Sequence, residues 1–342
     1  KGRSEIVHQI QDVNLHQSTN DVYATAIKMA VIFELRSLSA KIAELQGAFQ
    51  QKEKEFAEIV KMGRTELQEA VPMTLGAEFA AFAEAFARDR WRTFKSEERL
   101  RTVNLGGTAI GTGLTAPQEY IFLVIEKLRQ ITNLGLNRSE NLVDATANMD
   151  SFVEASGILK AFAVNLIKVA NDLRFMNLLG EIQLPQLQAG SSIMPGKVNP
   201  VIAETVVQAG LKIIANDLVI TETVSRGTFQ INEFLPLLAY AFLESLRILG
   251  NVTGMFKDYV QKIKADPLKC NEFLGHSEGI MTAFVPEIGY DRAGDLLKEF
   301  HAGGTKDLRG FLEEKLGKEL VAQVLSPQKL LSLGYKTHGK NA

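Results

Sequence analysis

Cysteine is almost absent from this 342-residue chain, in which Cys270 is the only one. A single cysteine excludes a disulfide within one chain, and it excludes a zinc site built from several cysteines. It is also consistent with a reducing, cytoplasmic setting. The net charge is only −2, and the chain lacks clustered Lys and Arg, so we expect no nucleic acid as a partner.

Long apolar runs and targeting segments are also lacking. No stretch of about 18 uncharged apolar residues occurs, so we expect no membrane span. The amino-terminal residues KGRSE do not resemble an apolar signal segment. The hydrophobic share of 46% and the charged share of 23% are ordinary for a globular protein. The chain is long enough to bury a sizeable core.

Helical patterns dominate what is present. They predict helices over residues 20–60 (with a break near residues 37–39), 75–100, 142–176, 199–223 and 232–265, and a further helix that begins around Pro117. Within 142–176, apolar residues recur every seven positions in two rows offset by three. The rows are Phe152, Leu159, Leu166, Leu173 and Ala155, Phe162, Val169, Met176. They predict the buried face of a bundle helix rather than a cofactor site.

The fold class we predict is all-α. Helices of this length carry more apolar surface than a small monomer covers, so we expect a long-helix bundle shared between subunits, formed by residues 20–265. Leu235, Leu238, Phe242, Leu246 and Leu249 are expected to line one face of its last helix. Asp266 and Pro267 end this bundle, and residues 266–342 are predicted to form a small C-terminal helical domain. Its last well-defined helical part is expected at residues 311–325, before Pro327.

Residues 190–200, GSSIMPGKVNP, form the most informative segment, which we call the signature loop. Two glycines and two prolines exclude a regular helix or strand there. The segment lies between strongly helical regions and carries two hydroxyls, an ammonium and an amide. Loops on rigid scaffolds often carry function, and an ordinary connector does not need this combination of residues.

Two other polar segments lie far from the signature loop in the sequence. Residues 14–21, NLHQSTND, open a predicted helix, and such residues are good N-caps. A helix N-terminus with free N–H groups also binds carboxylates, so either role fits this segment. Residues 63–68, GRTELQ, fit a solvated connector when taken alone.

These segments together resemble the aspartase/fumarase superfamily. The signature loop resembles that family's signature over its whole length. Residues 17–21 and 63–65 resemble the other two signature regions, and residues 105–113, LGGTAIGTG, resemble a glycine-rich family segment. The similarity runs from about His8 to the last helices.

The resemblance implies an anti-elimination next to a carboxylate, in which a base removes a Cβ proton and fumarate forms. The resulting aci-carboxylate dianion needs preorganised positive charge and N–H donors. By position, Ser191 is the base, Lys197 is the main counter-charge, and Ser192 and Asn199 bind the substrate carboxylates. The other end of the substrate is bound by Ser18, Thr19, Asn20 and Thr65. No metal or organic cofactor is implied, and the family assembles its site from three subunits of a homotetramer.

Glu66 departs from the family pattern, in which fumarases place His and many aspartases place Gln. A carboxylate there would repel a dianionic substrate unless it is protonated or paired, but it could accept hydrogen bonds from an ammonium. We therefore include Glu66 among the catalytic residues. The leading prediction is elimination of ammonia from L-aspartate. Fumarate hydratase is the alternative, and a non-catalytic structural member of the superfamily is the alternative of another class.

Two family segments are not found in the chain. The family's N-terminal domain is missing, so residues 1–19 are interpreted as its remnant and connector. Residues 174–180, RFMNLLG, lack the Ser-Gly-Pro turn expected there. We therefore expect the printed chain to omit segments. His8 and Gln9 stand where the family often has His-Pro, which makes a secondary carboxylate site doubtful.

Overall fold

The computed structural model describes residues 5–188 and 190–335, and this part of the chain is mostly helical. The long helices are α1 (Thr19–Glu55), α2 (Leu75–Leu100), α5 (Asp150–Leu179), α6 (Val201–Val224) and α7 (Leu235–Val260). Shorter ones are η1 (Gln9–Val13), α3 (Gln118–Thr132) and α4 (Leu142–Ala147). Towards the C-terminus follow α8 (Pro267–His276), η2 (Glu278–Ile280), α9 (Met281–Ile288), α10 (Tyr290–Gly303), α11 (Leu308–Leu316), α12 (Lys318–Val324) and α13 (Pro327–Leu330).

Three two-stranded sheets accompany the helices. β1 (Val60–Thr65) and β2 (Gln68–Thr74) form an antiparallel hairpin, with a bulge between Met62 and Arg64. β3 (Thr102–Val103) pairs in parallel with β4 (Asn137–Arg138), and β5 (Ile182–Gln183) pairs antiparallel with β6 (Lys264–Ala265). No strand was predicted from the sequence, so these pairings correct the all-α prediction in detail, while the mainly helical class is confirmed.

The chain divides into two compact units. The first contains the described residues of Lys1–Leu45 together with Phe86–Ala170 and Ile202–Phe256. The second contains Gln46–Ala85 and the described residues of Asn171–Val201 and Lys257–Ala342. All five long helices contribute residues to both units, α6 only its first residue to the second, whereas the hairpin and the signature loop belong to the second.

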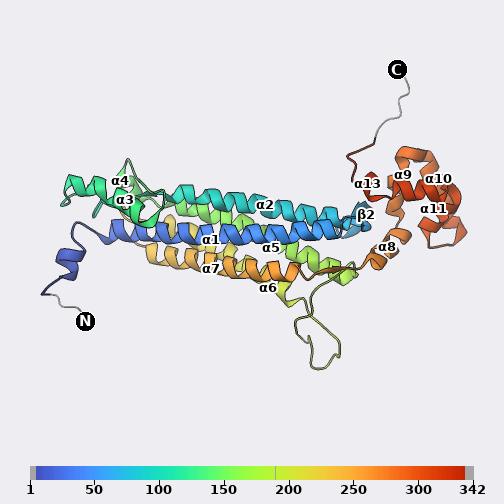
Figure 1. Ribbon diagram of the computed structural model, residues 1–342, viewed down its shortest axis with the longest axis horizontal. Coiled ribbons are helices and arrows are strands. Elements are labelled where there is room, and N and C mark those ends of the chain that lie inside the picture. The colour runs from blue at the N-terminus through green and yellow to red at the C-terminus, as the bar shows by residue number, and fades with distance from the viewer. Residues whose placement is uncertain (1–4, 189, 336–342) are drawn as a thin grey trace, which may run out of the picture. The chain divides into compact units, whose positions relative to one another are not determined.

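The core of the first unit lies between side-by-side segments of the long helices (Figure 1). Both predicted seven-residue rows of α5 are buried, including Leu173 and Met176, which belong to the second unit, and so is the predicted face of α7. The rings of Phe152 and Phe242 meet edge to face at 5.8 Å between centroids. Gly210 of α6 lies so close to Ile167 that a Cβ would stand 2.5 Å from its Cγ1. Glycine at that position therefore permits the close approach of α6 and α5.

Several predicted helix boundaries were wrong for identifiable reasons. The expected break near residues 37–39 does not occur, because buried Ser39 donates its hydroxyl to the Arg90 carbonyl at 3.4 Å instead of competing for its own helix. α1 ends at Glu55, and Val60 begins β1. The predicted helix over 142–176 is divided at Asn148, whose Oδ1 accepts the N–H of Asp150 at 3.2 Å.

Near the C-terminus, the helix predicted over 232–265 ends at Val260, because residues 264–265 pair as β6. The segment predicted as helix over 311–325 is two helices, α11 and α12. Gly317 separates them with φ +91°, a left-handed backbone conformation that favours glycine.

A core of its own holds the second unit together. Met62 from β1 packs with buried residues of the short helices, among them Leu274, Phe284 and Leu296. Gly279 of η2 lies against β2, where an added Cβ would stand 2.3 Å from the Ala70 carbonyl oxygen. This close contact fixes the hairpin against the C-terminal helices within the second unit.

The length and apolar composition of α7 bear on the prediction that the chain has no membrane span. Among the described helices it alone is long and apolar enough to cross a membrane by length and composition. However, 56% of its most apolar window is buried inside the protein. A core helix of a bundle passes the same test, so this is weak evidence for a membrane span.

Candidate active site

The segment before α1 forms a helix cap built on a buried carboxylate. Ser18 Oγ accepts the N–H of Asn20 at 3.2 Å, and Asp21 Oδ1 accepts the N–H of Ser18 at 2.9 Å. These reciprocal bonds satisfy N–H groups that the first turn of a helix leaves unpaired. The capping role considered from the sequence is therefore present.

Asp21 also connects this cap to the glycine-rich segment. Its second oxygen, Oδ2, accepts the N–H groups of Gly106 and Thr108 at 3.1 and 3.0 Å, and the side chain has no exposed surface. Both N–H donors lie more than 80 residues further along the chain. Thr108 holds a positive φ of +58°, so the carboxylate fixes a backbone conformation that few side chains favour.

Thr19 and Asn20 lie beside this junction. Asn20 donates its Nδ2 to the Ala109 carbonyl at 2.6 Å and lies 3.3 Å from the Thr19 hydroxyl. Thr19 is exposed and Ser18 is half-buried. The three predicted binding side chains of this segment therefore lie together at one end of α1, on a backbone fixed by Asp21.

Thr65 and Glu66 lie at the tip of the β1–β2 hairpin rather than in a solvated connector. Thr65 pairs with Gln68 across a two-residue turn in which Glu66 and Leu67 have φ of +52° and +62°. Two positive φ values are what a type I′ turn requires, although Asn-Gly is the usual sequence. Thr65, Glu66 and Leu67 are exposed, and among the described residues no hydrogen bond or ion pair engages the Glu66 carboxylate.

The signature loop is closed by its own backbone. Gly190 donates its N–H to the Lys197 carbonyl at 2.7 Å, and Lys197 donates to the Met194 carbonyl at 3.2 Å. A Cβ at Gly190 would stand 2.6 Å from that same Lys197 oxygen, and Gly196 has φ +82°. Both glycines are therefore needed for this conformation.

Ser191 lies inside this closed loop. Its Oγ accepts two backbone N–H groups, from Ile193 at 3.1 Å and from Met194 at 3.0 Å. Two donors directed at one hydroxyl oxygen favour negative charge on that oxygen. Lys197 is exposed, and no ion pair involves its ammonium within the described part of the chain.

Ser192 is exposed, whereas Asn199 is half-buried at the end of the loop. Asn199 lines a cavity of about 220 Å³, which is also lined by Asn177, Gln186 and Tyr259. Cys270 is not a candidate nucleophile. Burial, together with the nearby Glu181 carboxylate, raises the pKa of its thiol to about 12, which keeps the thiol protonated at neutral pH.

The predicted site residues thus form two groups. Ser18, Thr19 and Asn20 belong to the first unit, and Thr65, Glu66 and the signature loop belong to the second. Within residues 5–188 and 190–335, no His, Cys, Asp and Glu side chains gather in a group that could hold a metal ion.

Two buried carboxylates that support these groups were missed from the sequence. Asp21 lay in the segment interpreted as N-caps, and no role was predicted for Glu181. Glu181 has no exposed surface, and its Oε1 lies 2.5 Å from Nη1 of Arg64. The signal available in the sequence was an acidic residue between Gly180 and the run Ile182–Pro185 that leads to the signature loop.

Known proteins resemble this chain over nearly its whole length. A family model described as lyase matches residues 2–215. The aspartate ammonia-lyase of Helicobacter pylori (strain ATCC 700392 / 26695) is 41% identical over 339 residues, which are 97% of this chain and 72% of that protein. The aspartate ammonia-lyase of Pseudomonas aeruginosa is 42% identical over 340 residues, with the same coverage of both chains.

A solved structure is similar in fold as well as in sequence. The fumarate lyase:delta crystallin from Brucella melitensis, determined bound to cobalt, has a TM-score of 0.90 and 41% identity. The match covers 96% of this chain and 73% of that one. The chain therefore belongs to the lyase family, within the aspartase/fumarase superfamily. Its activity is that of a carbon–nitrogen lyase.

The buried carboxylate of Asp21 leads to a stability prediction. Replacing Asp21→Asn keeps the shape of the side chain but removes the charge that accepts three backbone N–H groups. We expect the free energy of unfolding to fall by about 1.5–3 kcal/mol, the range for hydrogen bonds to charged groups. Urea denaturation followed by circular dichroism measures this change.

The matched control is Asp12→Asn, because Asp12 is exposed and its carboxylate accepts only the N–H of His8 among the described residues. It should change the free energy of unfolding by less than about 0.5 kcal/mol. Equal effects of the two substitutions would contradict a structural role for Asp21.

Proposed function

We propose that this protein eliminates ammonia from L-aspartate to give fumarate, with Ser191 as the base. The observation that carries the proposal is the pair of backbone N–H groups, from Ile193 and Met194, directed at Ser191 Oγ. The names of the relatives at 41–42% identity support the substrate. The residue types of the signature loop support the reaction class.

The reaction requires a strong base, because the Cβ proton of aspartate is not acidic. A serine hydroxyl is a weak base, so its alkoxide must be stabilised. The two N–H donors on Ser191 Oγ provide part of that stabilisation, and Lys197 adds positive charge on the same loop. The alkoxide takes the Cβ proton, the electron pair passes into the adjacent carboxylate as an aci-carboxylate dianion, and ammonia then leaves from Cα.

The remaining site residues hold the substrate. Lys197, Ser192 and Asn199 bind the carboxylate that becomes the dianion, where preorganised charge stabilises the intermediate. Ser18, Thr19, Asn20 and Thr65 bind the other end. Their hydroxyl and amide groups suit a carboxylate, and the α1 N-terminus adds favourable backbone dipoles.

Glu66 is proposed to recognise the substrate ammonium. The hairpin presents its carboxylate at an exposed tip without a partner of its own among the described residues. A charge-assisted hydrogen bond to an ammonium would favour an amino acid over a hydroxy acid. This separates the proposed substrate from L-malate.

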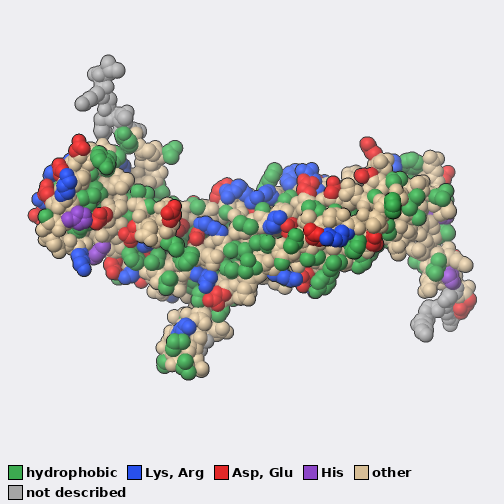
Figure 2. Space-filling model, turned by 180° about the vertical axis from the view of Figure 1, so that it is seen from behind, with side chains coloured by type: hydrophobic (Ala, Val, Ile, Leu, Met, Phe, Trp, Pro, Cys, Tyr) green, Lys and Arg blue, Asp and Glu red, His purple; other side chains and the backbone are tan. Residues whose placement is uncertain are grey.

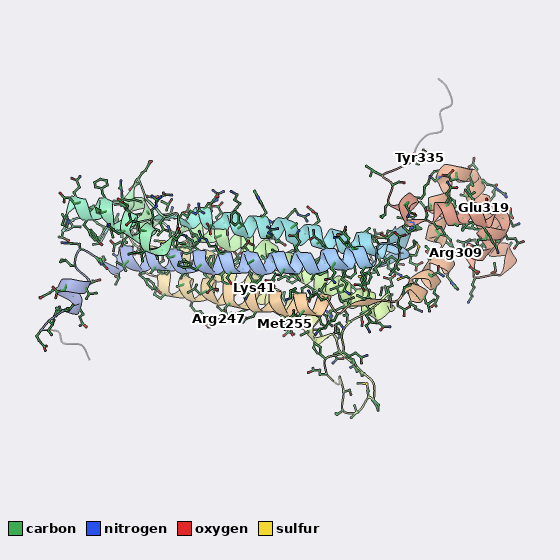
Figure 3. All side chains as sticks on the ribbon, in the orientation of Figure 1. Lys41, Arg247, Met255, Arg309, Glu319 and Tyr335 are labelled. Atoms are coloured by element: carbon green, nitrogen blue, oxygen red, sulfur yellow. The ribbon has the colours of Figure 1, made fainter. Side chains whose placement is uncertain are left out.

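A homotetramer with sites shared between three subunits is proposed as the working form. Large apolar side chains remain exposed on long helices of the first unit, among them Phe33, Leu211, Leu218 and Tyr240. Figure 2 shows hydrophobic side chains across the helical surface. A groove of about 480 Å³ between α1 and α7, lined by Lys41 and Arg247 (Figure 3), would accept a helix of a second copy.

The base assignment predicts the effect of Ser191→Ala. We expect kcat with L-aspartate to fall by about 10³-fold, because the reaction loses its proton acceptor. The matched control is Ser225→Ala at an exposed serine whose hydroxyl donates to the Glu222 carbonyl. This variant should keep wild-type turnover. Ultraviolet absorbance of fumarate measures both, and L-malate is assayed in parallel.

The outcomes of this assay separate the functions. Residual activity near wild type in Ser191→Ala would refute the base assignment. Signal from the wild-type protein with malate only would establish a fumarase. Absence of signal with both substrates from an intact, folded protein would favour a non-catalytic role.

The role of Glu66 is tested by Glu66→Gln. We expect KM for L-aspartate to rise about tenfold, which corresponds to about 1.4 kcal/mol of lost binding, with a smaller change in kcat. The control is Glu58→Gln, an exposed carboxylate next to the base of the same hairpin. Steady-state kinetics that show no change in KM for Glu66→Gln would exclude ammonium recognition by this side chain.

Sharing of the site between subunits predicts complementation. Chains with Ser191→Ala and chains with Thr65→Ala should each be inactive or nearly so. After the two are unfolded, mixed and refolded together, activity should return, because hybrid tetramers contain sites with both native residues. Each variant refolded alone is the control. A fully active monomer in sedimentation analysis would rule out the shared site.

A further inference from the structure

A cluster of buried ion pairs lies beneath the tip of the hairpin in the second unit. Glu181 has no exposed surface, and its two oxygens lie 2.5 Å from Nη1 of Arg64 and 2.7 Å from Nζ of Lys61. Lys61 also lies 2.5 Å from the Glu78 carboxylate. Arg64 stacks over the Phe273 ring at 5.0 Å. We call Lys61, Arg64 and Glu181 the clamp.

The clamp connects two segments that carry predicted site residues. Lys61 and Arg64 lie on β1, and Arg64 directly precedes Thr65. Glu181 directly precedes β5, which leads into the signature loop. Arg64 and Glu181 are 117 residues apart in the sequence. Their contact therefore fixes the distance between β1 and the start of β5, which local structure cannot fix.

The backbone around Glu181 is itself anchored. Asp266 donates its N–H to the Glu181 carbonyl at 2.9 Å, and Ile182 pairs with Ala265 in the β5–β6 sheet. The Glu181 side chain therefore projects from a fixed support. The hairpin is held to that support through charge, in addition to its apolar packing around Met62.

Buried ion pairs are poor sources of net stability, because removing two charges from water costs about as much as their attraction returns. Their arrangement instead imposes one geometry. The hairpin tip needs such a constraint, because Glu66 and Leu67 hold positive φ values that non-glycine residues rarely adopt. Strained backbone persists only where its surroundings determine it.

We propose that Glu181 is a positioning residue that, through Arg64 and Lys61, holds Thr65 and Glu66 at the hairpin tip in their working positions. This inference rests on the proposed function for its kinetic consequences. Glu181 does not touch the substrate in this proposal. It acts only through the strand that carries Arg64 and Thr65.

The test substitution is Glu181→Gln, which keeps the size of the side chain and removes its charge. The matched control is Glu78→Gln, which removes a carboxylate from the same Lys61 but leaves Arg64 paired. We expect Glu181→Gln to lower kcat/KM for L-aspartate by at least tenfold and Glu78→Gln by less than threefold. Arg64→Lys is a second variant that keeps the positive charge and should reproduce the loss if Glu181→Gln fails to fold.

A double-mutant cycle distinguishes positioning from general damage. If Glu181 acts through the hairpin tip, then Glu181→Gln should lower kcat/KM less in a Glu66→Gln background, which keeps measurable turnover, than in the wild-type protein, because residues in one network are not additive. A full, additive loss in that background would overturn the proposal. So would equal kinetic effects of Glu181→Gln and Glu78→Gln.

Hydrogen–deuterium exchange gives a readout that needs no turnover. In Glu181→Gln, exchange should accelerate in peptides covering residues 60–74 and stay unchanged in α5 residues of the first unit. Unchanged exchange in the hairpin would overturn the proposal whatever the activity. If the wild-type protein does not turn over L-aspartate, the proposed function fails, and exchange still decides whether the clamp holds the hairpin.

Discussion

Charge-assisted hydrogen bonding to carboxylates without exposed surface is the interaction on which two of the predicted site segments, residues 14–21 and 63–68, depend. In the first unit, Asp21 joins the N-terminus of α1 to the glycine-rich segment through three backbone N–H groups. In the second unit, Glu181 joins the hairpin to the strand before the signature loop. A buried carboxylate without partners is costly, so each of them permits one arrangement of its partners. The helices form the scaffold. The two carboxylates fix the conformation of the segments attached to it, Asp21 at the N-terminus of α1 and Glu181 at the hairpin.

The signature loop follows a different principle, because its own backbone closes it. The bond from Gly190 to the Lys197 carbonyl brings the ends of an eight-residue segment together. Ser191 is thereby placed where two amides of the same segment meet its oxygen. The chemical character of Ser191 is therefore local, whereas the placement of Thr65 and Asn20 depends on residues far away in the sequence.

This difference explains what the sequence could predict. Apolar periodicity predicted the buried rows of α5 and the face of α7, because helix packing depends on a repeating pattern. The hairpin was missed, because Glu66 and Leu67 are not the residues that mark a two-residue turn. The division at Asn148 was also missed, because its cap bond depends on one side-chain oxygen.

For the candidate site, the sequence indicated residue types and positions but not their long-range contacts. The types and positions of Ser191, Lys197 and Asn199 were available from the resemblance of one segment. The contact of Arg64 with Glu181 was not available, because no local pattern indicates a pair separated by 117 residues. Long-range ion pairs form only after the fold has brought their strands together.

The two-residue turn at the hairpin tip also constrains how this protein can change. Inserting one residue between Thr65 and Gln68 would shift the register of β2 and turn each of its side chains to the opposite face. The length of the tip is therefore fixed by the packing beneath it. The side chain at position 66 is exposed, so its chemistry can vary among residue types that tolerate the left-handed backbone there. Evolution or design can therefore exchange such residues at this position while the hairpin keeps its backbone.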